Sequence, residues 1–100
     1  MQYQLKSTQT FSDWVSNLDK SSKTQLLARL ARIENGNFGD HKAITHNLFE
    51  LRCFFAGGIR VYYTLRKTEI VLLLAGGTKS TQKRDIVKAS ILLSQLEEEA

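Results

Sequence analysis

The sequence predicts an α+β domain in which helices cover one face of a mostly antiparallel sheet. Apolar residues recur at helical spacing over residues 11–18, 26–33 and 86–96. Between the second and third of these stretches, residues 49–55, 59–66 and 70–75 are apolar or alternating runs of strand length, separated by short turns. With a short strand at the start, the order is β-α-α-β-β-β-α. A chain of 100 residues has the length of a single domain.

The first third of the chain predicts a short strand followed by a helical hairpin. The opening residues alternate between polar and apolar side chains, and Ser7 or Thr8 can then cap a helix. A short polar break leads to a second helix, which Ser21 or Ser22 caps and Gly36 ends. The side chains expected to face inward are Phe11, Trp14, Val15 and Leu18, and then Leu26, Leu27, Leu30 and Ile33.

Two alternating strands flank the pair Gly57-Gly58, and their pattern constrains the turn between them. A two-residue loop would place apolar side chains opposite polar ones. A three-residue loop over residues 56–58 keeps the apolar faces together, so we expect that loop. It would place Arg52 directly opposite Tyr62, with Arg60 diagonal to Arg52 on the same face.

The remaining segments complete the predicted layout. Residues 37–47 read as an irregular loop, and the strand 70–75 is apolar at every position, so it is expected inside the sheet with both faces covered. Gly76-Gly77 is expected to end that strand. The last helix carries one apolar stripe for the core. It also carries a second stripe, which needs either more core or a partner protein: Val87, Ile91 and Leu92.

Charge and composition narrow the class of protein. The formal net charge is +4, a bias toward acidic partners such as nucleic acid. The single cysteine, Cys53, excludes an internal disulfide and is expected as a small buried hydrophobe. The start of the chain lacks an apolar leader, and no apolar run approaches membrane-spanning length, so we expect a cytoplasmic protein with no membrane association. The histidines lack the companions of a metal site, so neither a metal nor another cofactor is expected.

Cationic side chains gather on the predicted sheet. Arg52 and Arg60 are polar members of otherwise apolar strands, and Lys79 follows the third strand. A guanidinium group matches phosphate oxygens bidentately, so these residues are candidates for stabilising charge on a phosphate. Tyr62, on the same face, could donate or orient a proton. Its ordinary pKa near 10 makes it a poor base unless neighbouring cations lower that pKa.

The sequence as a whole resembles the RelE/ParE toxin superfamily, and more narrowly the HigB-type addiction module killer proteins. The resemblance covers about residues 3–95 and depends on the order and spacing of FSDWVSNL, ARLARIENGNFGDHKAI, ELR, IRVYY and LLLAGGTKSTQKRDIVKA. It implies a toxin of a bacterial type II toxin–antitoxin module. The function implied first is a ribosome-dependent endoribonuclease that cleaves messenger RNA. The alternatives are a non-catalytic, ParE-like poison of DNA gyrase, or a degenerate toxin that only binds its antitoxin.

The resemblance also implies roles for single residues. Arg60 matches an arginine motif of RelE-like toxins, and Lys79 lies where related toxins keep a basic residue. The tyrosine that well-studied members carry in the last helix is absent here, which leaves Asp85, His41 and His46 as alternatives for proton transfer. Further contacts with RNA or the ribosome are expected from Arg29, Arg32, Lys42, His46, Lys83 and Arg84.

The implied partner is an antitoxin with a helix-turn-helix domain. It is expected to dock on the second stripe of the last helix, formed by Val87, Ile91 and Leu92, or to cover the arginine face directly. Alone, the chain is expected to be a monomer or weak dimer. With its antitoxin, it is expected to form a higher-order complex.

Overall fold

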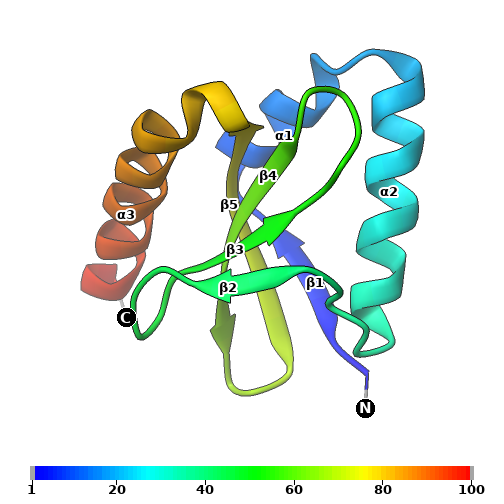
Figure 1. Cartoon of the computed structure of the whole chain (residues 1–100). Helices are drawn as coiled ribbons and strands as arrows, with labels where there is room; N and C mark the ends of the chain where they lie inside the picture. Colours follow the sequence, from blue (N-terminus) through cyan, green and yellow to red (C-terminus); the bar gives the residue numbers. More distant parts are fainter. Residues whose placement is uncertain (1, 100) are drawn as a thin grey trace.

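The computed structural model describes residues 2–99 and contains one mixed sheet with three α-helices (Figure 1). The elements follow one another as β1 (Gln4–Ser7), α1 (Gln9–Ser16), α2 (Lys20–Glu34), β2 (His41–Ala43), β3 (Phe49–Arg52), β4 (Ile59–Arg66), β5 (Ile70–Thr78), the 3-10 turn η1 (Lys79–Thr81) and α3 (Gln82–Glu99). The strand order in the sheet is β1-β5-β4-β3-β2. β1 runs parallel to β5, and the other neighbours are antiparallel, which confirms the predicted α+β class.

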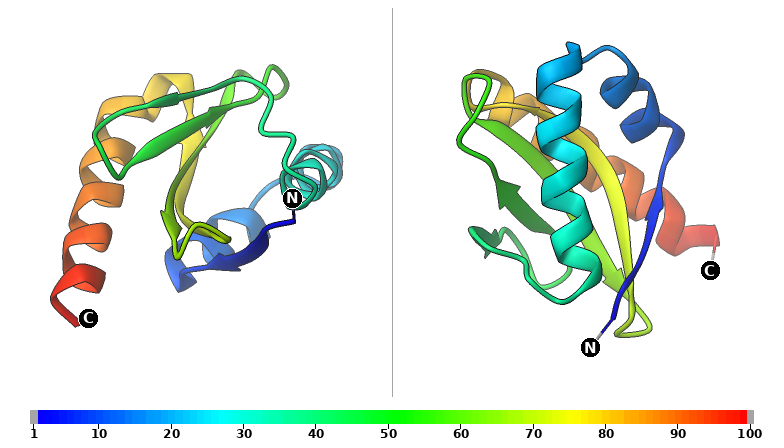
Figure 2. Two further views of the ribbon diagram at one scale, coloured as in Figure 1. Left: turned by 90° about the horizontal axis from the view of Figure 1, so that it is seen from below. Right: turned by 90° about the vertical axis from the view of Figure 1, so that its right-hand side faces the viewer.

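Helices cover both faces of the sheet, and the expectation that they share one face was wrong. The hairpin of α1 and α2 lies on one face and α3 on the other (Figures 1 and 2). The cause lies in the central strand β4, whose side chains point alternately to the two faces. Val61 and Tyr63 pack with Leu26 and Ile33 of α2, whereas Tyr62 packs with Ala89 and Leu93 of α3.

The register between β3 and β4 differs from the predicted one by two residues. Arg52 lies opposite Arg60, and Glu50 lies opposite Tyr62. The connecting loop is longer than expected. The hydrogen bond from Cys53 N–H to Ile59 O, at 2.9 Å, is the last one between the two strands before the loop. A shift of two residues leaves every side chain on its predicted face, so the separation of apolar and polar faces was correct.

Two strands differ from the sequence-based expectation. β2 lies within the stretch predicted as irregular, where it pairs with β3 at the sheet edge. All three of its residues are exposed, so no apolar alternation revealed it. β5 continues through Gly76 and Gly77 where the glycines were expected to end it. It is an interior strand, as predicted.

The glycines in β5 are needed because both faces of the strand are in close contact with neighbouring elements. A Cβ atom on Gly76 would lie 2.3 Å from the ring of Trp14 on α1. A Cβ atom on Gly77 would lie 1.8 Å from Oδ2 of Asp85 on α3. α1 and α3 therefore both approach the end of β5 that contains Gly76 and Gly77.

The helix starts were predicted in part. Thr8 caps α1, and its hydroxyl accepts a hydrogen bond from Phe11 N–H at 3.1 Å. Asp19 caps α2, and not Ser21 or Ser22, because its carboxylate accepts from both the N–H and the hydroxyl of Ser22. Leu27 is 54% exposed and does not face inward as expected.

Among residues 2–99, no helix is both long enough and apolar enough to cross a membrane.

Candidate nucleic-acid interface

Three cationic side chains meet at one end of the sheet. Arg52 and Arg60 are opposite each other on β3 and β4. Lys79 begins η1, and its N–H donates to Gly58 O at 2.9 Å in the β3–β4 loop. A Cβ atom on Gly58 would lie 3.4 Å from the Lys79 Cβ and 3.9 Å from the Arg60 Nη1, so these two side chains flank the same backbone position. We call Arg52, Arg60 and Lys79 the basic cluster.

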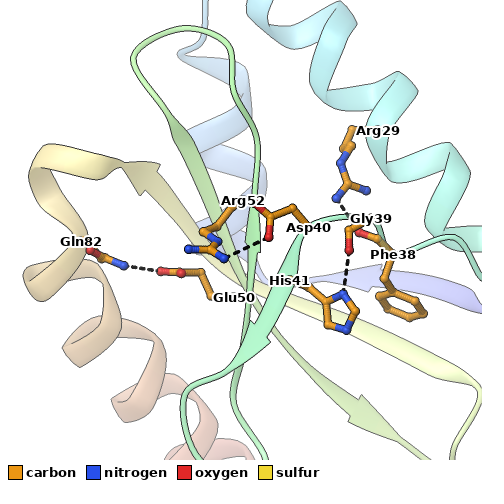
Figure 3. A network of polar contacts seen from close by, with 8 residues as sticks. All are labelled: Arg29, Phe38, Gly39, Asp40, His41, Glu50, Arg52 and Gln82. Atoms are coloured by element: carbon orange, nitrogen blue, oxygen red, sulfur yellow. Dashed lines mark hydrogen bonds and ion pairs between the residues drawn. The ribbon is translucent and has the colours of Figure 1, made fainter.

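The members of the basic cluster differ in exposure and in pairing. Lys79 is exposed, Arg52 is half-buried, and Arg60 is only 9% exposed. Arg52 forms an ion pair with Asp40 at 3.0 Å, and its N–H donates to Asp40 O at 2.9 Å (Figure 3). Both partners are about one-third exposed, so the pair contributes at most about 1 kcal/mol to stability. The pair fixes the direction of the Arg52 guanidinium and neutralises part of the charge of the cluster.

Beneath the cluster, on the α3 side of the sheet, lies a buried polar group formed by Glu50, Tyr62 and Gln82. Glu50 is fully buried and accepts a hydrogen bond from Gln82 Nε2 at 2.6 Å (Figure 3). Tyr62, its cross-strand neighbour, is also fully buried. Burial, followed by the carboxylates of Glu50 and Asp85, raises the pKa of Tyr62 well above its ordinary value.

The expectation that Tyr62 acts in catalysis does not fit this position. A base would need neighbouring cations to lower its pKa, and here the pKa is raised. The Tyr62 hydroxyl is also buried and has no hydrogen-bond partner among residues 2–99. Tyr62 therefore belongs to the core beneath the cluster, as Tyr63 does on the opposite face, where burial raises the Tyr63 pKa to about 12.

The alternatives for proton transfer occupy different environments. Asp85 is 1% exposed, accepts a hydrogen bond from the Thr81 hydroxyl and lies 3.6 Å from Arg84 Nε. His41 and His46 are both exposed, and the Nδ1 atom of His41 lies 2.9 Å from Gly39 O. Within residues 2–99, no three His, Cys, Asp or Glu side chains are grouped as a metal site requires.

The structure separates the other residues expected to contact RNA. Arg32, Lys42, His46, Lys83 and Arg84 are exposed, as contacts to RNA must be. Lys83 and Arg84 line a hollow together with Lys79, next to the basic cluster. Arg29, which was also expected to contact RNA, is only 7% exposed. Its guanidinium donates to Phe38 O and packs against Gly39, where no Cβ occupies the space (Figure 3).

The second stripe of the last helix divides into two parts. Val87 and Ile91 are 58% and 54% exposed, so they form an apolar surface on α3. Leu92 is partly buried and packs against the core between α3 and the sheet, so its expected role in antitoxin docking stays a prediction. Cys53 is 2% exposed, and burial raises the pKa of its thiol, as expected for a small core residue.

Sequence reasoning did not single out three residues that shape this region: Asp40, Glu50 and Gln82. Asp40 pairs with Arg52, and Gln82 holds Glu50. A signal for Glu50 was present, because it alternates with Arg52 on the same strand and therefore shares its face. Asp40 and Gln82 reach the site through the tertiary fold, and nothing in the local sequence indicates their partners.

Solved structures of RelE toxins share this architecture. Escherichia coli RelE in the free state, a double arginine-to-alanine mutant, matches with a TM-score of 0.69 and 15% identity, over 88% of this chain and 97% of RelE. RelE in the RelE–RelB complex from Pyrococcus horikoshii matches with a TM-score of 0.61 and 17% identity, over 79% and 97% of the two chains. The intact Escherichia coli RelBE toxin–antitoxin complex gives 0.59 and 14%, over 76% and 95%. The chain therefore has the RelE toxin fold.

Sequence comparison identifies the family. Residues 13–93 match the family model described as phage derived protein Gp49-like (DUF891). A Haemophilus influenzae protein, described as uncharacterized, is 42% identical over 97 residues, which span 96% of this chain and 98% of that protein. The chain belongs to the phage-derived Gp49-like family. With the RelE fold, this confirms the resemblance to the RelE/ParE superfamily, and the narrower HigB-type assignment stays a prediction.

Proposed function

We propose that this protein is the toxin of a type II toxin–antitoxin module and that it cleaves messenger RNA on the ribosome. The observation that carries the proposal is the basic cluster of Arg52, Arg60 and Lys79 at one end of the sheet. RNA cleavage by the 2′-hydroxyl builds additional negative charge on the phosphorus centre, and fixed cations lower the energy of that state. The RelE fold and the family membership support the same class of function.

Arg60 and Lys79 are the residues that we assign to this charge. Arg60 is held by burial of its stem, and its Nε atom has no hydrogen-bond partner within residues 2–99. Lys79 is exposed, and its backbone N–H donates to Gly58 O in the loop that leads into β4, the strand of Arg60. Arg52 completes the cluster, although part of its charge is satisfied by Asp40. Proton transfer is assigned to none of these groups, and His41, His46 or groups of the ribosome are the sources to test.

The partner that we propose is a protein antitoxin of the HigB-type modules, with a helix-turn-helix domain. Its docking surface on this chain is the exposed apolar pair Val87 and Ile91 on α3. The two residues are one helical turn apart, so an amphipathic helix of the antitoxin can cover both. We propose that the toxin acts in the cytoplasm, as a monomer or weak dimer until the antitoxin assembles it into a larger complex.

Induction of the wild-type chain in growing cells tests the proposed function. Primer extension on translated messages should reveal new 5′ ends soon after induction, while a DNA-damage reporter stays at its basal level. Intact messages together with a DNA-damage response would replace the proposal with inhibition of DNA gyrase. Intact messages with neither growth arrest nor a damage response would leave a chain that only binds its antitoxin.

A further inference from the structure

A second hollow lies beside the basic cluster, between α2 and the β3–β4 loop. It has a volume of about 260 Å³ and is lined by residues that include Arg29, Arg32, Gly39, Asp40, Arg52 and Phe54. Arg52 also belongs to the basic cluster, so the hollow and the cluster have one residue in common. We call this hollow the guanidinium pocket, because the planar cations of three arginines form part of its wall.

The charges in the guanidinium pocket do not balance. Within residues 2–99, Asp40 is the only carboxylate in its lining, and it pairs with Arg52. Arg29 and Arg32 have no ion-pair partner in that part of the chain. An anion that entered the pocket would therefore meet two guanidinium groups that no carboxylate already satisfies.

Arg29 gives the strongest reason to expect an anion here. Only 7% of Arg29 is exposed. Its Nη2 atom donates to Phe38 O, but its Nη1 atom has no hydrogen-bond partner within residues 2–99. Burying a cation without a counter-charge is costly, since the charge loses its hydration. That loss lowers the pKa of Arg29, and the neighbouring Arg32 lowers it further. Gly39 lets the backbone approach this guanidinium, because any Cβ there would overlap with it.

Phe54 supplies a different kind of contact at the edge of the same pocket. It is 83% exposed, whereas the other exposed large apolar residues of the described chain are aliphatic. A ring that is 83% exposed contributes little to the core, and its flat face suits the face of a nucleobase. Phe54 thus places an aromatic surface next to the arginines that would hold a phosphate.

We infer that the guanidinium pocket binds one nucleotide of single-stranded RNA, with the phosphate on Arg29 and Arg32 and the base stacked on Phe54. This inference rests on the proposed function, because it assigns the nucleotide next to the one that is cut. Arg52 joins the pocket to the basic cluster, so an RNA strand crossing the cluster continues into the pocket. The base on Phe54 then sets which position along the message lies over Arg60 and Lys79.

Equilibrium binding of a short, fluorescein-labelled, 2′-O-methyl single-stranded RNA tests the inference without requiring cleavage. Phe54→Leu should weaken binding about 5- to 150-fold, the range expected for loss of one base–aromatic stack. Phe54→Trp should bind like the wild type. Arg32→Ala should reduce the slope of log affinity against log salt by about 0.7, the value for one phosphate contact on a single strand. Leu65→Ala removes an exposed apolar side chain at the far end of β4 and serves as the matched control.

A scan of the RNA with single abasic nucleotides then identifies the stacked base. At one position of the RNA, the abasic nucleotide should weaken binding to the wild type but not to Phe54→Leu. The abasic nucleotide and the Phe54→Leu substitution each remove the same base–ring contact, so their effects do not add. Wild-type affinity in Phe54→Leu would overturn the inference, while cleaved messages in cells would leave the proposed function standing. If Phe54→Leu and Arg32→Ala lost antitoxin binding but bound RNA like the wild type, the inference would also be overturned, and the pocket would be a protein interface. Absence of RNA binding by the wild type, together with intact messages, would remove both.

Discussion

Replacing Gly77 by alanine tests whether the close contact between β5 and α3 is real. The new Cβ would lie 1.8 Å from Asp85 Oδ2 and 2.8 Å from Thr81 Oγ1. Asp85 is 1% exposed, and moving it away from the new Cβ breaks its hydrogen bond with Thr81. Overpacking costs about 1–3 kcal/mol, and an unsatisfied buried carboxylate adds about 1–3 kcal/mol more.

The expected loss is therefore about 2–6 kcal/mol, a large part of the ~5–15 kcal/mol that stabilises an ordinary domain. Urea denaturation followed by the fluorescence of Trp14 measures it as a fall in the midpoint at unchanged slope. Gly57→Ala is the control without a clash: nothing lies within 4 Å of the new Cβ, although the φ of Gly57 is positive, at +77°, and that of Gly77 is not. Strain alone should cost that variant about 1–2 kcal/mol. A smaller loss for Gly77→Ala than for Gly57→Ala would refute the packing described here.

Three further predictions concern charge and the antitoxin. The raised pKa values of Tyr62 and Tyr63 mean that the native state holds their protons more tightly than the unfolded chain. Stability should thus be complete below about pH 10 and fall as the pH rises toward 12, with Tyr63→Phe weakening the fall; a urea midpoint constant over this window would contradict it. Asp40→Asn should change stability by less than about 1 kcal/mol. It should tighten binding of the fluorescein-labelled RNA, because Arg52 loses its ion-pair partner, and weaker binding would argue against an RNA contact at Arg52. Ile91→Asp should abolish co-purification with the antitoxin at an unchanged melting temperature, since the side chain is 54% exposed; retained antitoxin would place docking elsewhere.

The sequence predicted those parts of the fold that depend on periodic apolar residues. The helical stripes and the alternation in β3 and β4 follow from burial of one face. The helices, these two strands and their inward faces were therefore predicted mostly correctly. The register was wrong because it depends on loop conformation, and Ala56, Gly57 and Gly58 take three successive positive φ values. An alanine at such an angle carries no sequence signal. β2 was missed because all of its side chains are exposed.

The candidate site was predicted to a smaller extent, for a similar reason. Alternation placed Arg52 and Arg60 on one face, and the structure brings them opposite each other. The burial of Arg29 was not predictable from its helix, since arginines at such spacing are usually exposed. It depends on Gly39, ten residues away along the chain, where a missing Cβ makes room for the guanidinium. Contacts of this kind join distant segments and leave no local pattern.

The proposed RNA cleavage is tested most directly with purified ribosomes that carry a defined message, to which the purified protein is added. The wild type should cut the message within the ribosome. Arg60→Ala and Lys79→Ala should each reduce the cleavage rate by about 10² to 10³, as expected for loss of one fixed donor. Lys67→Ala, which removes an exposed cation in the β4–β5 turn, should cut at the wild-type rate. An uncut message with the wild-type protein, or wild-type cleavage by Arg60→Ala, would contradict the account.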